Sequence, residues 1–220
     1  MAVMDSRRRG PRGDISADLL LAAGERVLAA RGLTGLSLRA VAREAGVTPT
    51  AVYTYFADMA DLRHRIGDRF LGTLDLSLLT SPPAAAGLAA FLRHVLDVFA
   101  HAPGQVQILA SQRILGTHAL ALNEALLAFF IDRVGHSPAG AAAATDLVTE
   151  WVHGTLLLSP SNLPLSDEVP LPGYPRTTAM LTGTAPEASG GTAPGSGRRG
   201  DVPAVTSLDL VVRAVTVSWD

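Results

Sequence analysis

The segment GVTPTAVYTYF, residues 46–56, carries hydroxyl-bearing side chains at close spacing. Thr48 is a good N-cap, and Pro49 then falls at the first helical position, where its missing N–H costs nothing. The segment therefore predicts a short helix over 48–55. Threonine methyls can meet the thymine methyl group, and the hydroxyls of threonine and tyrosine can reach base edges or phosphates. Such a surface suits contacts with DNA.

A second short helix is predicted directly before this one. Ser37 is a good N-cap for a helix over 37–45, and Gly46 stops that helix. Two short helices separated by a glycine turn are the layout of a helix-turn-helix, whose second helix enters the major groove. The alternative is an ordinary helical hairpin inside a core. An earlier helix is predicted over 16–31, and a fourth helix starts at Asp58.

Helical patterns continue through most of the chain, and no segment alternates convincingly as a strand does. The fourth helix has a predicted buried stripe, and four further helices follow at 84–101, 103–116, 118–134 and 138–159. The stripe consists of Leu62, Ile66, Phe70, Leu74 and Leu78. Residues 160–201 are rich in Pro, Gly, Ser and Thr, which predicts a long, partly disordered loop. Residues 202–217 fit a helix or a strand. The predicted fold class is all-α.

Composition limits the function classes. The 220 residues include no cysteine, which excludes disulfides, thiolate metal sites and cysteine nucleophiles and fits a reducing cytoplasm. Glu25 and Arg26 cut the first apolar run too early for a signal peptide or a membrane span, so no membrane segment is expected. Residues 1–72 hold 11 arginines and 8 acidic residues, whereas the remainder has more acids than arginines. A basic head on an acidic body is the polarity expected of a DNA-binding protein.

The stretch GLTGLSLRAVAREAGVTPTAVYTYFADMADL resembles the N-terminal DNA-binding domain of the tetracycline-repressor (TetR/AcrR) family of bacterial transcriptional regulators. Spacing, turn glycine and the ending Tyr-x-x-Phe agree over about residues 15–66. The resemblance implies an all-helical homodimer with a variable C-terminal ligand-binding and dimerisation domain. It divides the chain into a flexible Arg-rich arm (1–14), a three-helix helix-turn-helix domain (15–60) and a larger helical domain (61–220). In that family the last two long helices pair with their copies, which here would be residues 138–159 and 202–217.

The resemblance also assigns candidate DNA contacts. Ser37 falls where the family has a phosphate-contacting N-cap, and Arg39 where some members contact a base or a phosphate. The second helix supplies the other candidates, which are Thr48, Pro49, Thr50, Tyr53, Thr54 and Tyr55. Met59 stands where the family commonly has a phosphate-binding lysine. The four arginines of the arm could contribute backbone affinity from an adjacent minor groove, or the arm could be a solvated tail.

Candidates for ligand binding are His94, Gln112, His118, Trp151 and His153. Trp151 fits dimer core or packing as well as a platform for a ligand. The six histidines do not converge at metal-ligand spacing, no catalytic triad or carboxylate pair stands out, and the glycines of GTAPGSGRRG lack the features of a phosphate-binding loop. We therefore expect no metal site, no cofactor and no enzymatic activity.

These patterns predict a cytoplasmic, homodimeric regulator that binds double-stranded operator DNA. We expect a repressor that a small apolar or amphipathic effector ligand releases from the operator. A ligand-independent dimeric DNA-binding protein is the first alternative, and a structure without a cavity would favour it. A helical enzyme with an incidental helix-turn-helix is the second.

Overall fold

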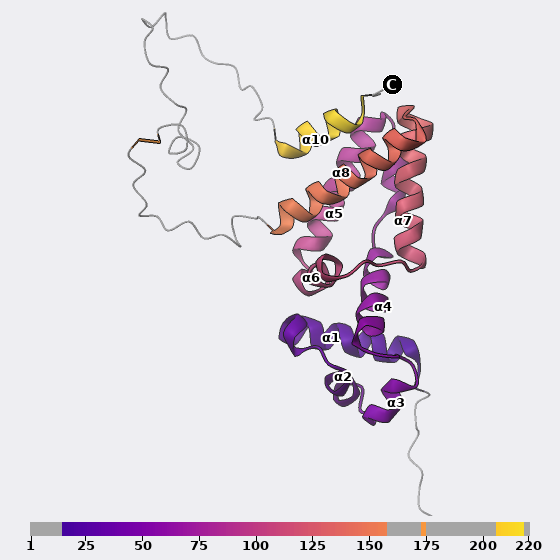
Figure 1. The fold of residues 1–220 in the computed structure, drawn as a ribbon, viewed down its shortest axis with the longest axis vertical. Coiled ribbons are helices and arrows are strands. Elements are labelled where there is room, and N and C mark those ends of the chain that lie inside the picture. Colours follow the sequence, from indigo (N-terminus) through magenta and orange to yellow (C-terminus); the bar gives the residue numbers. More distant parts are fainter. Residues whose placement is uncertain (1–14, 158–172, 175–205, 218–220) are drawn as a thin grey trace, which may run out of the picture. The chain divides into compact units, whose positions relative to one another are not determined.

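The computed structural model describes residues 15–157, 173–174 and 206–217. The predicted arm at 1–14 and nearly all of the predicted loop at 160–201 lie outside the described residues. The chain divides into one compact unit of Met1–Leu156 with Ser207–Asp220 and a second unit, Leu157–Thr206. Every regular element that the structure describes is helical, which confirms the predicted all-α class (Figure 1).

The first three helices begin at the side chains that their sequence predicts. Helix α1 (Ala17–Gly35) starts at Ser16, whose hydroxyl accepts a bond from the Leu19 amide. Gly32, with φ of 65°, breaks the helical backbone inside α1, which agrees with the predicted helix end. Helix α2 (Leu38–Glu44) and helix α3 (Pro49–Tyr53) follow. The predicted helix over 48–55 is therefore shorter, and residues 54 and 55 form a turn.

Helix α4 (Met59–Leu71) starts at Asp58, whose carboxylate accepts a bond from the Asp61 amide. Leu62, Ile66 and Phe70 form its buried stripe, as predicted. The extension of that stripe along the same helix to residues 74 and 78 is wrong. The helix ends at Leu71, but Leu74 beyond it is buried, as predicted. In the short 3-10 helix η1 (Leu76–Thr80), Leu79 is buried and residue 78 is only half-buried.

The larger, C-terminal part of this unit is called the body here, and its elements are α5 to α10. They are α5 (Ala84–Ala100), α6 (Pro103–Ser111), α7 (Thr117–Ala128) with the π-helical turn η2 (Phe129–Val134), α8 (Pro138–Leu157) and α10 (Ser207–Val215). The pattern over 103–116 ends early, at residue 111. Residues 207–215 are helical, which resolves the open choice between helix and strand there. Helix α10 packs on α5.

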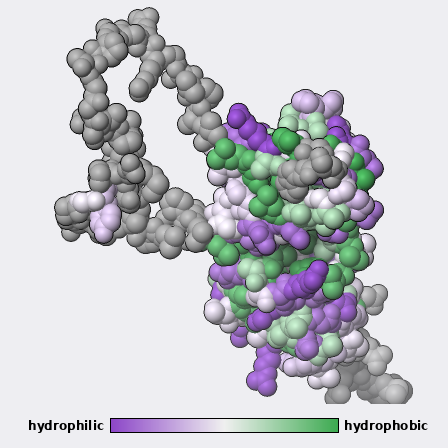
Figure 2. Space-filling model, turned by 45° about the horizontal axis from the view of Figure 1, so that its top comes forward, coloured by the Kyte–Doolittle hydropathy of each residue, from purple (hydrophilic) through white to green (hydrophobic). Residues whose placement is uncertain are grey.

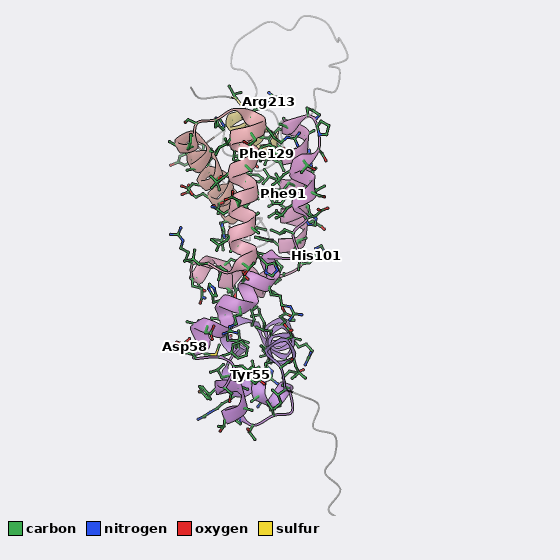
Figure 3. All side chains as sticks on the ribbon, turned by 90° about the vertical axis from the view of Figure 1, so that its right-hand side faces the viewer. Tyr55, Asp58, Phe91, His101, Phe129 and Arg213 are labelled. Atoms are coloured by element: carbon green, nitrogen blue, oxygen red, sulfur yellow. The ribbon has the colours of Figure 1, made fainter. Side chains whose placement is uncertain are left out.

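Two clusters of buried hydrophobic residues stabilise these helices. The N-terminal core gathers side chains of α1 to α4, and the body core gathers those of η1, α5, α7, η2, α8 and α10. Phe91 and Phe129 of the body core point in among the body helices (Figure 3). Helix α4 contributes to both clusters, with Leu62 and Ile66 in the first and Phe70 in the second. Helix α6 also divides between them through Ile108 and Val106.

The surface mixes hydrophilic and hydrophobic side chains, and green hydrophobic patches reach the surface of the body (Figure 2). Among the exposed large apolar residues are Leu147 of α8 and Leu210 of α10, at 39% and 58% exposure. In the described part of the chain, no helix is long and apolar enough to cross a membrane.

Candidate DNA-binding and ligand-binding sites

Helix α3 is only five residues long, so its position depends on residues at its buried side. Val52 and Phe56 are fully buried in the N-terminal core. Between α2 and α3, Gly46 has φ of 69°, a conformation that favours glycine. The amide of Val47 then donates to the carbonyl of Ala42 over 2.9 Å, which closes the turn. The result is a helix-turn-helix whose second helix has an exposed outer face.

The predicted DNA contacts lie together on this domain. Seven of the eight are exposed, namely Ser37, Arg39, Thr48, Pro49, Thr50, Tyr53 and Thr54. The hydroxyls of Ser37 and Thr48 accept bonds from the amides of Ala40 and Ala51, at 3.1 and 3.3 Å, so both residues cap their helices. Arg39 makes no ion pair with any other residue that the structure describes, which leaves its guanidinium available to a phosphate or a base.

Tyr53 and Tyr55 differ in their surroundings. Tyr53 is 58% exposed. Tyr55 (Figure 3) is half-buried and packs against the N-terminal core. It donates its hydroxyl to the carbonyl of Ile15, just before the first helix. Its phenol ring therefore helps to fix the domain, and Tyr53 is the tyrosine that projects from the outer face of α3.

A polar network joins the end of α3 to the start of α4. Asp61 accepts bonds from the amide of Ala57 at 3.1 Å and from Arg65 at 2.9 Å, and the Arg65 guanidinium lies 5.2 Å from the centre of the Phe56 ring. Partial burial acts to raise the pKa of Asp61, but the hydrogen bonds from Arg65 and Ala57 outweigh it, and the pKa lies below its ordinary value. The ionised carboxylate therefore stabilises this junction.

The body contains a cavity of about 400 Å³. Its apolar wall comes mainly from α5 and α7, and includes Phe91, Leu92, Val95, Phe99, Leu122 and Leu126. Its polar residues are Arg113, Asn123, Thr145, Asp146, Thr149 and His153. A cavity of this size, mostly apolar with a few polar groups, is of the kind that holds small organic molecules.

Of the five predicted ligand-binding residues, only His153 lines this cavity. The Nε2 atom of His94 accepts a bond from the Asp75 amide, and Gln112 donates to the carbonyl of Ala60. His118 bonds to Asp68, and Trp151 packs against the body core. Sequence reasoning did not single out the other polar cavity residues. The spacing of Thr145, Thr149 and His153 at four-residue intervals was the available signal.

Asp68 of α4 caps the first turn of α7. Its Oδ1 atom accepts bonds from the amides of His118 and Ala119, at 3.0 and 2.9 Å, and its Oδ2 atom lies 3.1 Å from Nδ1 of His118. Gly116, the N-cap of α7, has no side chain to make such bonds, and a Cβ there would overlap the Asp68 carboxylate. A carboxylate at a helix N-terminus is also favoured by the helix dipole. Because α7 lines the cavity, Asp68 links the cavity wall directly to α4.

The match with a family model decides the identity of the helix-turn-helix. Residues 20–66 match the model of bacterial regulatory proteins, tetR family. These residues therefore form a DNA-binding domain of the tetR family. The resemblance inferred from the sequence is thus confirmed, and the matched residues run from α1 into α4.

Similar proteins extend the comparison beyond this domain. The transcriptional repressor DrrR1 of Streptomyces coeruleorubidus is 30% identical over 113 residues, which are 51% of this chain and 42% of that protein. The chain thus spans about two-fifths of the length of this relative. Apo ActR of Streptomyces coelicolor superposes with a TM-score of 0.72 at 16% identity, over 94% of this chain and 97% of ActR. ActR in complex with actinorhodin superposes with a TM-score of 0.63 at 20% identity, over 69% of this chain and 72% of that ActR chain. Both ActR structures share the fold.

Tyr53→Ala is expected to weaken DNA binding by at least tenfold without changing the thermal stability, because the side chain is exposed and projects from α3. Tyr55→Phe is the matched variant, and it should lower the free energy of unfolding by about 1 kcal/mol through loss of the bond to Ile15. Gel-shift titration and thermal melting measure the two effects. Unchanged DNA affinity in Tyr53→Ala would contradict the placement of α3 on DNA.

Asp61→Asn should destabilise the protein at neutral pH and much less in acid. The pKa of Asp61 is lowered in the folded chain, so its stabilisation is present above the pKa of the unfolded chain, near 4, and is lost as the pH falls through the folded value. Denaturant unfolding at pH 7 and pH 3 would measure the difference. An equal loss of stability at both pH values would show that the charge is irrelevant to the junction.

Asp68→Ala should lower the free energy of unfolding by roughly 1 kcal/mol, as loss of a helix cap does. Asp68→Asn retains an oxygen acceptor for the amides of His118 and Ala119 and should recover part of that loss. Hydrogen exchange at the start of α7 should accelerate in the alanine variant. Wild-type exchange in that variant would show that α7 does not depend on the carboxylate.

Proposed function

We propose that the protein is a DNA-binding transcriptional repressor that a small ligand releases from its operator. The observation that carries this proposal is the exposed outer face of α3, held from behind by the fully buried Val52 and Phe56 in a tetR-family domain. Arg39, Thr48, Thr50 and Tyr53 would make the contacts to bases and phosphates, with Ser37, Pro49 and Thr54 beside them. The relative DrrR1 is named as a transcriptional repressor, which supports the same direction of control.

The proposed form is a homodimer working in the cytoplasm on double-stranded operator DNA. Two copies of α3 must lie about 34–36 Å apart to enter successive turns of the major groove. Helices α8 and α10 are the proposed dimer elements, because each exposes a large apolar side chain, Leu147 and Leu210. Exposed apolar surface of this kind is stabilised when a second copy covers it.

The proposed signal is a small apolar or amphipathic molecule in the body cavity. The solved complex of ActR with actinorhodin supports ligand binding within this fold. Binding would displace α7, and the bonds between α7 and Asp68 would transmit the displacement to α4. To empty an almost fully occupied operator, the ligand must favour the released conformation by about 10⁴-fold.

The alternatives have less support. A ligand-independent DNA-binding protein would not need a cavity, and the body contains one of about 400 Å³. For a helical enzyme, neither the matching family model, which describes bacterial regulatory proteins, nor DrrR1, which is named as a transcriptional repressor, points to a reaction.

The experiment that tests DNA binding is selection of sites from a random DNA library by the purified protein. The proposal predicts enrichment of an inverted repeat with half-site centres one helical turn apart or a multiple of it. Affinity for the selected site should fall steeply with salt, because phosphate contacts release counterions. Failure to enrich any sequence would overturn the proposal.

Leu147→Glu should break the dimer, because a charge would be placed where apolar surface is buried between copies. Leu147 is 39% exposed in a single chain, so the variant should still fold. Trp151→Glu is a less clean test, since Trp151 packs against the body core and its loss also affects folding. Leu19→Glu on α1, with the same exposure, is the control. Analytical ultracentrifugation should show monomers only for Leu147→Glu, and a persistent dimer would move the interface elsewhere.

A further inference from the structure

One wall of the body cavity carries a row of polar side chains on a single helix. Thr145, Thr149 and His153 all belong to α8 and all line the cavity. Their four-residue spacing puts them on one face, with successive residues separated by about 6 Å along the axis. These three residues are called the α8 row.

Two residues of the α8 row already donate their polar hydrogen to a backbone carbonyl. The Thr149 hydroxyl donates to the carbonyl of Thr145 over 2.8 Å. The Nδ1 atom of His153 lies 2.8 Å from the carbonyl of Thr149, and because a carbonyl only accepts, Nδ1 carries the hydrogen. In the neutral ring Nε2 is then an acceptor. What Thr149 and His153 offer to a ligand is therefore lone pairs, which bind donors.

Thr145 is buried, at 6% exposure, and its Oγ atom has no hydrogen-bond partner among the described residues. Thr149 on the same helix and Thr216 just after α10 behave differently, since both donate to the carbonyl four residues earlier. A buried hydroxyl without a partner is unfavourable, and each such group in a folded protein calls for a reason. A ligand group in the cavity that bonds to Thr145 supplies one.

The wall formed by α5 is of the opposite character. Phe91, Leu92, Val95 and Phe99 line the cavity there and offer no hydrogen-bonding side chain. A ligand that fills the space must therefore be apolar on one side. It must also present hydrogen-bonding groups along the edge that meets α8.

We propose that the ligand of this cavity is a largely apolar molecule with hydroxyl groups along one edge, and that these hydroxyls bond to the α8 row. This inference rests on the proposed ligand-responsive function and gives that ligand a chemical class. The apolar face contacts the α5 wall, one hydroxyl pairs with Thr145 at the buried end, and a second donates to Thr149 or His153.

Two matched probes test the proposal, 2,7-dihydroxynaphthalene and 2,7-dimethoxynaphthalene. Both carry two oxygens on the same edge of the same ring system, but only the first can donate hydrogen bonds. Isothermal titration calorimetry on the full-length protein should show the dihydroxy probe binding at least tenfold more tightly, as expected for one to two additional net hydrogen bonds. Equal affinity for the two probes, or no binding of either, would overturn the proposal.

Variants then locate the contact. Thr145→Val keeps the shape of the side chain and removes the hydroxyl, so it should weaken the dihydroxy probe by about three- to tenfold and the dimethoxy probe, whose ether oxygens can only accept a hydrogen bond, by less. Thr155→Val is the control, because Thr155 lies on the same helix but does not line the cavity. If Thr145→Val binds both probes as the wild type does, the proposal is wrong.

A structural role of Thr145 would give a different pattern. Because its hydroxyl has no partner among the described residues, Thr145→Val should melt at the wild-type temperature or above it. A large drop in melting temperature together with equal loss of both probes would assign Thr145 to packing and overturn the proposal. DNA selection by the same protein gives an independent result, so failure of the probes and failure of DNA binding can be told apart.

Discussion

Helix α4 must fit two hydrophobic cores at once, and the other elements of the structure are arranged around that constraint. Leu62 and Ile66 are fully buried in the N-terminal core, and one turn further on Phe70 is buried in the body core. Side chains in close-packed cores shift between discrete arrangements and do not deform continuously. A change in the body core that displaces α4 therefore reaches the helix-turn-helix without any further linkage.

Asp68 adds a polar connection to this apolar one. It lies two residues after Ile66 and caps α7, which forms part of the cavity wall. The same helix thus contacts the N-terminal core, the body core and the cavity wall within a few residues. Among these contacting elements, helix α3 is the one furthest from the cavity wall (Figure 1), and it is too short to be stable alone. The position of α3 is fixed by the buried Phe56, by the hydrogen bond of Tyr55 to Ile15, and by the hydrogen bonds of Asp61.

The features predicted well from the sequence are those that local chemistry determines. The caps at Ser37, Thr48 and Asp58 and the turn at Gly46 depend only on residues within three or four positions. These caps also made the candidate DNA surface predictable, because once the ends of a short helix are known, its apolar positions show which side is buried and which residues are exposed.

The features that were missed depend on contacts between distant segments. The polar ends of His94, Gln112 and His118 bond to other elements, at Asp75, Ala60 and Asp68, and residue type alone does not reveal this. The end of α4 at Leu71 was hidden because its apolar spacing continues past the last helical turn. Likewise, Tyr53 and Tyr55 have the same side chain two residues apart, and only the fold separates an exposed ring from one bonded to Ile15.

The contact between Gly116 and Asp68 has a consequence for inherited variation. Asp68 touches two amides through one oxygen, so a residue that supplies an oxygen at the same place preserves most of the contact. Position 116 has no such freedom, because any side chain there would collide with the carboxylate. Natural variants at position 116 should therefore separate α7 from α4 while leaving the cavity lining and the outer face of α3 intact.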